Sequence, residues 1–474
     1  MDTSMLSVGI DIGTSTTSMV VSRLNVQNTA SCFSVPRVAI TGADIVYRSS
    51  ILQTPQADGD RIDADAVAAF LAEEYRRAGI TPEQVQTGAV IITGESSRKE
   101  NAALVTQRMS SLAGEFVVAT AGPDLESIIA AKGAGTAQYS EEHACRAANL
   151  DIGGGTTNIA LFHSGQLEAK GCWDIGGRLV RVAEGAVTYV SPRAAVVADS
   201  LGLSLHPGCR ADVTQLRRLT DRMAQLLAEA MGLAPETPLC RMVETREATP
   251  MALERRADCL SFSGGVANYI YESSEDWFRH GDIGPLLADS IRRSVLFTGC
   301  KVIPARETIR ATVIGAGAYT TTVSGSTIDC VREELLPMKN LPAFVPGKGA
   351  EEAAGRGDGQ ALEEEARWFL QESAADNLVF CLKRFRQPGY AQVCALANAL
   401  TRAAEALPPG APLLVLTEQD YAKALGQALR RRVRGREVVC IDSVRAEQGD
   451  YLDLGRPLLG GLALPVVVKT LIFG

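Results

Sequence analysis

The sequence is poor in the residues that build disulfide frameworks and zinc sites. It has only four histidines, and its eleven cysteines are scattered with no C-x-x-C pair among them. A secreted disulfide scaffold or a zinc-binding domain would show closer cysteine and histidine spacing. These absences exclude both classes and favour a chain with free thiols in a reducing cytoplasm.

The chain also lacks a surplus of basic residues and a long apolar run. Its formal net charge is −8, which argues against nucleic acid as the main partner. The most apolar late stretch, 462–473, is too short to cross a bilayer and is interrupted by Pro465 and Lys469. No basic residues precede the first strand-like segment, so no signal peptide is expected. We expect a soluble, cytoplasmic protein with neither a nucleic-acid nor a membrane partner.

What the chain does contain is one eight-residue motif in two copies. Residues 11–18 read DIGTSTTS, and residues 151–158 read DIGGGTTN. Each copy ends one apolar run and begins another, which predicts a strand, a tight turn of glycine and threonine, and a second strand. Two unrelated turns would not keep the same acid in the same register, so the repeat indicates a shared task.

The composition of the two turns suits phosphate. Glycine and threonine present backbone N–H groups and hydroxyls without bulky side chains in the way. The predicted phosphate-binding residues are Gly13, Thr14, Ser15, Thr16, Gly153, Gly154, Gly155, Thr156 and Thr157. Asp11 and Asp151, at the lip of each turn, would repel a bare phosphate, so a cation must lie between, and Mg²⁺ bound through water is the usual one. Two such hairpins facing each other would bind one metal–polyphosphate from both sides.

Three further glycine-rich segments stand out. The stretch 122–135, which includes Glu126, and the stretch 312–318 predict helices rich in small residues. Such helices can approach each other closely at a hinge between lobes, although a tightly packed core helix explains the first stretch equally well. Ser263 to Val266 follows a predicted strand and suits a glycine floor beneath a flat ring. Asp174 to Arg178 is another glycine turn, predicted to lead into a helix.

Strands that alternate with helices predict an α/β fold. Between 337 and 359 there are three prolines and five glycines, a composition typical of linkers and long loops. We therefore expect a first lobe at 1–145, a second lobe at 146–336, a linker or long loop at 337–360, and a small C-terminal α/β unit at 361–474.

Taken in order, these motifs resemble the actin / heat-shock-protein-70 / sugar-kinase ATPase superfamily across roughly residues 5–325. The resemblance implies two actin-like (ribonuclease H-like) lobes with MgATP in a central cleft. It places Asp11 and Asp151 as the Mg²⁺ ligands, acting through water, and adds Glu126 beside the γ-phosphate as a third catalytic residue. The implied adenosine-binding residues are Gly264, Gly265 and Val266. Catalysis would rest on positioning and electrostatic stabilisation of an in-line transfer.

More narrowly, the blocks at 9–17, 92–102, 124–135 and 465–473 are similar to the EutA family of ethanolamine ammonia-lyase reactivating factors. This resemblance implies a chaperone-like factor of ethanolamine utilization that hydrolyses ATP to ADP and phosphate. Its partner would be ethanolamine ammonia-lyase, in which it exchanges damaged cobalamin for intact coenzyme, with cobalamin contacted only through that enzyme. It further implies a cytoplasmic protein associated with a bacterial microcompartment. Whether the chain forms a homo-oligomer stays open.

Other functions on the same fold remain as alternatives. A small-molecule kinase would need a carboxylate base near the acceptor hydroxyl, and Asp124 and Glu126 are candidates. A filament-forming relative is a second alternative. A radical-enzyme activator with an iron–sulfur cluster is the least supported alternative, because the sequence lacks closely spaced cysteine ligands.

Overall fold

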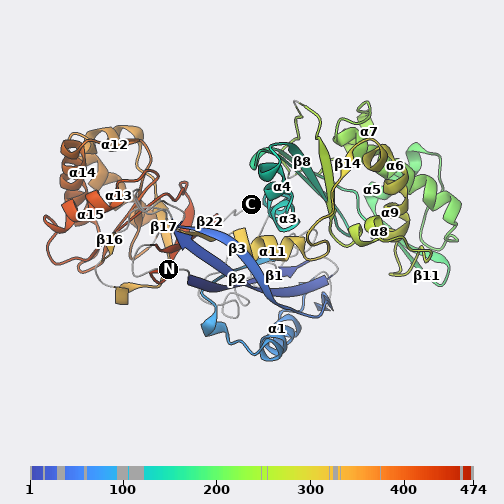
Figure 1. The fold of residues 1–474 in the computed structure, drawn as a ribbon, viewed down its shortest axis with the longest axis horizontal. Coiled ribbons are helices and arrows are strands. Elements are labelled where there is room, and N and C mark those ends of the chain that lie inside the picture. Colours follow the sequence, from blue (N-terminus) through green and yellow to red (C-terminus); the bar gives the residue numbers. More distant parts are fainter. Residues whose placement is uncertain are drawn as a thin grey trace.

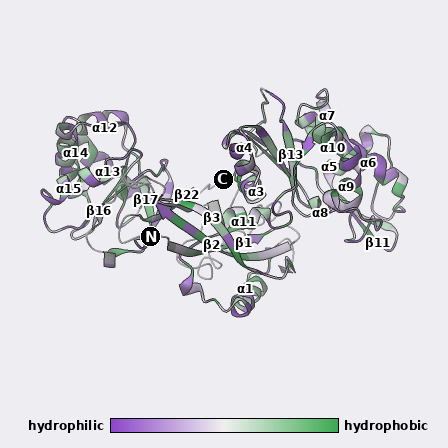
Figure 2. Ribbon diagram, viewed as in Figure 1, coloured by the Kyte–Doolittle hydropathy of each residue, from purple (hydrophilic) through white to green (hydrophobic). Residues whose placement is uncertain are grey.

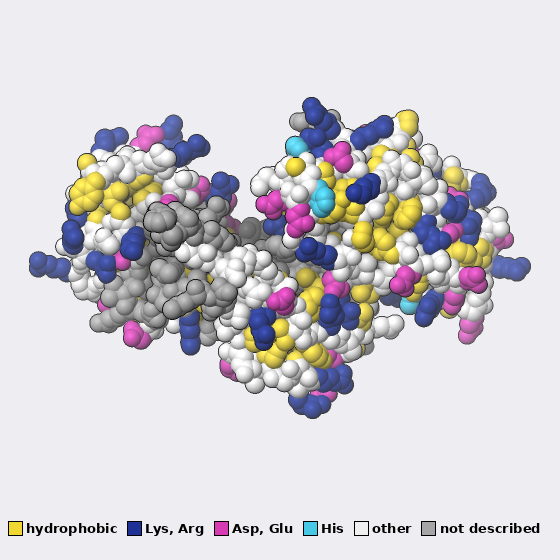
Figure 3. Space-filling view, viewed as in Figure 1, with side chains coloured by type: hydrophobic (Ala, Val, Ile, Leu, Met, Phe, Trp, Pro, Cys, Tyr) yellow, Lys and Arg dark blue, Asp and Glu magenta, His cyan; other side chains and the backbone are white. Residues whose placement is uncertain are grey.

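A computed structural model shows three α/β parts (Figure 1). The described residues are 3–13, 16–28, 38–57, 61–92, 105, 122–246, 248–253, 255–319, 321–323, 329–330, 333–373, 375–458 and 463–470. Thr14 and Ser15 of the first predicted phosphate turn lie outside these ranges. In Figures 1 and 3 the second lobe and the C-terminal unit stand apart above the first lobe, with a hollow between them.

The first lobe is a mixed sheet formed around the β1–β2 hairpin. Its strand order is β3-β2-β1-β7, with β4 beside β2. β1, β2 and β3 are antiparallel, whereas β7 lies parallel to β1. Helix α1 packs against this sheet through Val67, Leu71 and Tyr75. The elements are β1 (Thr3–Ile12), β2 (Thr16–Asn28), β3 (Val38–Arg48), β4 (Leu52–Gln53), β5 (Gln56–Ala57), β6 (Arg61–Ile62), α1 (Ala64–Ala78) and β7 (Thr87–Ile92).

The second lobe repeats the design of the first. Its strand order is β10-β9-β8-β13-β14, again with three antiparallel strands followed by parallel ones. The predicted α/β fold with two similar lobes is confirmed. The sheet strands are β8 (Arg146–Ile152), β9 (Thr157–His163), β10 (Gln166–Trp173), β13 (Cys259–Ser263) and β14 (Lys301–Val302). The other elements of this lobe are α4 (Thr136–Glu142), β11 (Val180–Ala183), β12 (Ala186–Val190), α5 (Pro192–Ser200), α6 (Val213–Ala230), α7 (Pro238–Met242), α8 (Ala267–Tyr271), α9 (Gly284–Arg293) and α10 (Val295–Thr298).

Local sequence signals set the ends of the longer helices. The carboxylate of Asp63 accepts the first free N–H groups of α1, and Gly79 ends that helix with φ 66°. Asp212 caps α6 in the same way. α6 buries one apolar side and shows hydrophilic residues on its outer side (Figure 2). Within the described ranges, no helix combines the length and apolarity that a bilayer crossing requires.

Helices α3 (Pro123–Gly133) and α11 (Ala311–Tyr319) cross between the two lobes. α3 packs against β8, β9 and β10, whereas α11 packs against β1, β2 and β7. A Cβ on Gly133 would lie 1.9 Å from Ala311 O, and a Cβ on Gly315 would lie 2.0 Å from Ile129 O. No side chain fits at either position, so the close approach predicted from the small residues is confirmed. The predicted boundaries assign α11 to the second lobe, yet it covers the sheet of the first.

The C-terminal unit is an eight-stranded sheet in the order β15-β22-β21-β17-β18-β19-β20-β16. β17 to β20 are parallel neighbours, and the remaining strands pair antiparallel. Its elements are β15 (Thr321–Val323), β16 (Asp329–Cys330), β17 (Met338–Phe344), α12 (Lys348–Ala354), α13 (Gln360–Ser373), β18 (Val379–Leu382), α14 (Tyr390–Ala403), β19 (Leu413–Thr417), α15 (Ala422–Arg430), β20 (Val438–Asp442), β21 (Asp450–Leu454) and β22 (Pro465–Thr470).

Residues 337–360, predicted to be a linker or long loop, instead contain a strand and a helix. β17 lies inside the sheet, and α12 follows it. Pro342 stands where β17 passes from pairing with β21 to pairing with β18, a place where a missing N–H is tolerated. Gly347 and Gly355 bound α12, so these residues end elements and do not keep the chain free. Because the sheet also includes strands from 321–330, the unit begins earlier than predicted.

The C-terminal unit packs on the first lobe through its last strand. Val467 of β22 forms a buried cluster with Ala89, Ile91, Ile129 and Ala316. These partners lie on β7, α3 and α11. The last strand therefore shares one buried cluster with both crossing helices, so a movement of these helices would disturb the packing of the C-terminal unit.

Candidate functional site

The two repeated motifs form two hairpins of the same geometry. Gly13 N donates to Thr16 O at 2.9 Å, and Gly153 N donates to Thr156 O at 2.9 Å. A Cβ on Gly155 would meet nothing within 4 Å, so the second turn is open on its outer side. The sequence repeat is therefore a structural repeat, with the same backbone hydrogen bond closing both turns.

Asp151 is buried at the end of β8, and two hydroxyl groups bond to its carboxylate. Ser263 Oγ donates to Asp151 Oδ1 at 2.5 Å, and the Thr312 hydroxyl also bonds to the carboxylate. Burial raises the pKa of Asp151 to about 6, although both hydrogen bonds lower it. At neutral pH the carboxylate is charged, and the cost of that buried charge favours a cation beside it.

Ser263 and Thr312 were not predicted as site residues. Ser263 ends β13 and lies beside Asp151 in the parallel register of β8 and β13. Its place before two glycines at a strand end was a usable signal. Thr312 lies 161 positions after Asp151 in the sequence, and only the packing of α11 brings the two together.

The first turn of α11 connects the two hairpins. Thr312 bonds to Asp151, and the neighbouring Val313 carbonyl lies against Gly9, where a Cβ would come within 2.0 Å of it. Gly9 is on β1, two residues before Asp11. Asp151 lies on β8 of the second lobe, and Asp11 lies on β1 of the first. Thr312 and Val313 of α11 therefore connect these two strands, through the hydrogen bond to Asp151 and the contact with Gly9.

The predicted adenosine turn lies directly on the end of β8. Gly264 has φ 85°, and a Cβ there would lie 2.4 Å from Ile152 O. At Gly265 a Cβ would meet nothing within 4 Å, so this residue faces open space beside the second hairpin. Val266 is 4% exposed, and its side chain belongs to the core of the second lobe. Of the three residues, Gly265 has open space beside it for a ligand. Val266 could contact a ligand only through its backbone, because its side chain is buried.

Glu126 lies in the first turn of α3, about two turns before the crossing at Gly133, and is 8% exposed. Nearby Asp124 has Lys170 Nζ 2.7 Å from its Oδ2, and Thr249 N donates to its Oδ1 at 3.0 Å. Burial raises the pKa of Asp124, but the hydrogen bonds from Lys170 and Thr249 outweigh this effect and leave the pKa below its ordinary value. Asp124 is therefore poorly suited to act as a general base. Glu126 is connected to the hairpins along α3, and its role stays a prediction.

The donor set at the second hairpin fits hydrated Mg²⁺. Asn158 faces Asp151 across β8 and β9, so the two side chains share one face of the sheet. Asn158 Oδ1 is buried and has no hydrogen-bond partner among the described residues. No group of three or more His, Cys, Asp or Glu in this part of the chain could hold a metal. Mg²⁺ keeps several waters and needs only one or two carboxylates, so these oxygens match it better than zinc.

The buried carboxylate of Asp151 predicts a pH-dependent stability. Its pKa of about 6 lies above the ordinary value of 3.8, so the folded chain holds a proton that the unfolded chain loses. The stability of the nucleotide-free protein should therefore fall as the pH rises from about 4 to 7, by roughly 3 kcal/mol. In Asp151→Asn the group is neutral in both states, and this component should disappear.

Urea denaturation at a series of pH values measures this effect. Trp173 and Trp277 both lie in the second lobe, whereas Trp368 is 62% exposed already. Tryptophan fluorescence therefore follows the lobe that carries Asp151. A difference between wild type and Asp151→Asn that stays constant over the whole pH range would contradict the prediction.

The family described as ethanolamine utilisation protein EutA matches residues 3–474 of the chain. The chain is 37% identical over 473 residues to the ethanolamine ammonia-lyase reactivase EutA of Salmonella typhimurium, covering 99% of this chain and 98% of that protein. To the protein of the same name from Escherichia coli it is 36% identical over 470 residues, with the same coverage.

Solved structures show weaker similarity. The PPX-GPPA enzyme of Aquifex aeolicus has 13% identity and a TM-score of 0.41, covering 66% of this chain and 99% of that one. The ethanolamine utilization protein EutJ of Carboxydothermus hydrogenoformans has 17% identity and a TM-score of 0.33, covering 66% and 89%. Similarities of this size carry no argument about function.

Proposed function

The chain belongs to the EutA family of ethanolamine utilisation proteins, and on that premise we propose that it is an ATP-dependent reactivating factor for ethanolamine ammonia-lyase. The single observation that carries the proposal is the hairpin repeat. Each lobe ends a strand at an aspartate and closes a glycine turn with the same hydrogen bond, and α11 contacts both. Such a pair suits a metal–triphosphate held between two lobes.

In this proposal the chain positions the nucleotide and stabilises its charge. Asp11 and Asp151 would hold Mg²⁺ through water, and the backbone N–H groups of the two turns would bind phosphate oxygens. Bound Mg²⁺ supplies charge neutralisation on the transferring phosphoryl group. Ser263 and Thr312 fix the carboxylate of Asp151, so its orientation depends on where α11 lies. Hydrolysis of ATP to ADP would thus change the contacts that α11 makes with each lobe.

The difference in binding free energy that reactivation requires can be calculated. To move the lyase from 1:99 to 99:1 in favour of an open form that releases damaged cobalamin, the factor must bind the open form about 5.5 kcal/mol more tightly. Movement of α3 and α11 would reach the C-terminal unit through Val467, which belongs to one buried cluster with residues of both helices and of β7. The proposal therefore assigns cobalamin exchange to the lyase and its control to the nucleotide state of this chain.

The test is ATP hydrolysis with and without a lyase blocked by cyanocobalamin, followed by measurement of corrinoid release. We expect release to require ATP and Mg²⁺ and to leave this chain free of cobalamin. Stoichiometric phosphorylation of a metabolite in the absence of any protein partner would instead favour a small-molecule kinase. The kinase alternative loses Asp124 as a candidate general base, because its carboxylate is already bound by Lys170 and Thr249.

Substitutions of two adjacent glycines distinguish an effect on ATP binding from an effect on stability at the adenosine turn. Gly265→Ala adds a methyl group where nothing lies within 4 Å, so we expect unchanged stability and weaker ATP binding. Gly264→Ala must accommodate φ 85° and a backbone oxygen 2.4 Å away, which should destabilise the chain by roughly 2 kcal/mol or more. Thermal unfolding and calorimetric titration with MgATP measure both. Unchanged ATP affinity in Gly265→Ala would remove this turn from the nucleotide site.

A further inference from the structure

The turn from Asp174 to Arg178 is part of the second hairpin's surroundings. Gly177 N donates to Gly153 O at 3.0 Å, and Arg178 N donates to Gly154 O at 2.7 Å. A Cβ on Gly176 would lie 2.5 Å from Gly154 O. The sequence predicts a helix after this turn, but β11 follows it. The turn instead packs against the glycines of the hairpin and fixes the main chain of Arg178 beside them.

The opposite side of the same turn meets the residues around the adenosine turn. Ile283 N donates to Gly177 O at 3.0 Å. A Cβ on Gly177 would lie 2.9 Å from Gly284 Cα and 3.0 Å from Val266 Cγ2. Arg178 is therefore attached to a turn that is packed between Gly153–Gly154 on one side and Val266 on the other.

The guanidinium of Arg178 is weakly paired. Its Nε lies 3.9 Å from Asp282 Oδ2, too far for a hydrogen bond, and it is buried with no hydrogen-bond partner among the described residues. Asp282 Oδ1 already accepts the N–H of Gly284 at 2.9 Å. Burial raises the pKa of Asp282 above its ordinary value. The hydrogen bond from Gly284 and the nearby Arg178, His280 and Arg181 lower it, but by less. Arg178 and Arg181 thus form a cationic group beside one carboxylate, which leaves positive charge uncompensated.

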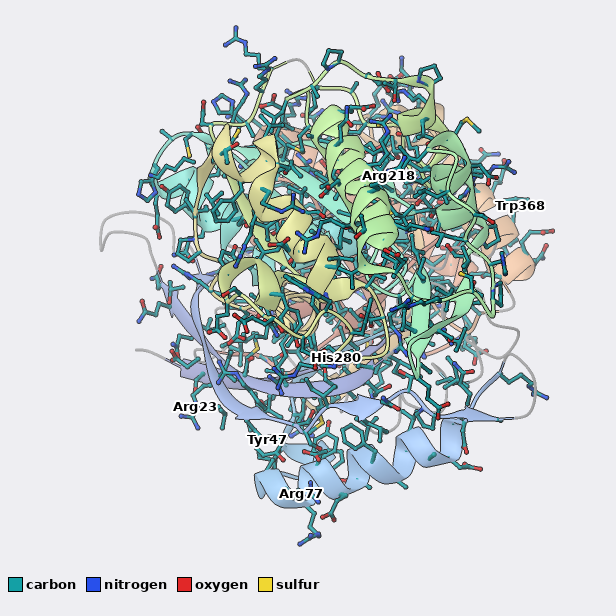
Figure 4. The ribbon with its side chains drawn as sticks, turned by 90° about the vertical axis from the view of Figure 1, so that its right-hand side faces the viewer. Arg23, Tyr47, Arg77, Arg218, His280 and Trp368 are labelled. Carbon is teal, nitrogen blue, oxygen red and sulfur yellow. The ribbon has the colours of Figure 1, made fainter. Side chains whose placement is uncertain are left out.

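His280 lies close to the same carboxylate. Its Nε2 lies 2.5 Å from the hydroxyl of Tyr269, on the helix that follows the adenosine turn. Figure 4 shows His280 at the lower edge of the second lobe in that view.

A bound triphosphate needs such a charge. Residues 11–18 and 151–158 contain no lysine or arginine and two aspartates, so a nucleotide of about four negative charges would meet further anions there. Mg²⁺ compensates only part of this. On the basis of the proposed function, we propose that Arg178 binds the phosphate groups of the nucleotide, exchanging its distant contact with Asp282 for direct hydrogen bonds to phosphate oxygens. Its planar guanidinium suits two-point contact with phosphate.

Arg178→Gln tests the proposal, with MgATP, MgADP and adenosine as probes in calorimetric titration of the full chain. A charged hydrogen bond to phosphate is lost, so affinity for MgATP should fall about 10- to 100-fold. Adenosine carries no phosphate, and its affinity should change less than about threefold. Arg178→Lys keeps the positive charge but loses the planar guanidinium that can contact phosphate at two points, and we expect an intermediate loss of MgATP affinity. Arg181→Gln removes a charge from the same group, at a residue that contacts the Tyr189 ring, and serves as the matched control.

The outcomes separate this inference from the proposed function. If wild type binds no MgATP, the proposed function fails. If wild type binds it and Arg178→Gln binds it equally well, the inference alone is overturned. An equal loss in Arg178→Gln and Arg181→Gln would also overturn it, because a general field would then explain the effect. If Arg178→Gln does not fold, Arg178→Lys carries the test through the ratio of its MgATP to adenosine affinity.

Discussion

Asp151→Asn is expected to abolish ATP hydrolysis and lyase reactivation while leaving the fold at least as stable at pH 8. The carboxylate is 5% exposed, and burial raises its pKa to about 6, so its charged form is costly in the folded chain. Asparagine can still accept the hydrogen bond from Ser263, but it carries no charge for Mg²⁺. Loss of this electrostatic stabilisation should lower hydrolysis by roughly 100-fold or more. Initial-rate assays and thermal unfolding at pH 8 measure the two effects.

Two further variants make this result specific. Asp11→Asn changes the equivalent acid of the first hairpin and should give the same loss of hydrolysis. Glu168→Gln changes a carboxylate on the same sheet that pairs with Arg146 at 2.9 Å, and it should leave hydrolysis unchanged. Full reactivation by both Asp11→Asn and Asp151→Asn would refute the assignment of the two hairpins.

Gly133→Ala is expected to have the largest effect on stability. The added Cβ would lie 1.9 Å from Ala311 O in the crossing helix, so α3 and α11 must move apart. Overpacking against backbone, without a flexible side chain to yield, should cost roughly 3 kcal/mol or more. The same shift would draw Thr312 away from Asp151, so the affinity for MgATP should fall as well. Urea denaturation and calorimetric titration measure these changes.

The reciprocal contact provides the control. Gly315→Ala would bring a Cβ within 2.0 Å of Ile129 O, and it separates the same two helices. The double variant should therefore cost less than the sum of the single variants, because the first separation relieves the second clash. Gly349→Ala lies in α12 with nothing within 4 Å and should stabilise the chain by up to about 1 kcal/mol. Full additivity would show that the two glycines do not share one crossing.

Much of the fold follows from local sequence patterns. The motifs at 11–18 and 151–158 predict strand, turn and strand, and both turns close with the same glycine-to-threonine hydrogen bond. The small residues of 122–135 and 312–318 predict close helix approach, which the contacts of Gly133 and Gly315 confirm. These features are local because a turn or a helix face depends on a few neighbouring residues.

The same reasoning fails where composition is ambiguous. Prolines and glycines at 337–360 indicate a linker or long loop, yet Pro342 lies within β17, and Gly347 and Gly355 bound α12. The glycine turn at 174–178 indicates a helix start, yet it packs on the hairpin. Proline and glycine mark the ends of elements and free chain alike, and partner strands decide between the two.

By itself the sequence determined the paired hairpins, their aspartates, the glycine turn at 264–265 and the family. Tertiary structure alone decided that Thr312 reaches Asp151, that Val467 shares a buried cluster with β7 and both crossing helices, and that Arg178 lies beside Gly154. The reason is physical: hydrogen bonds along a turn are set by adjacent residues, whereas contacts between residues far apart in the chain depend on how whole sheets and helices pack.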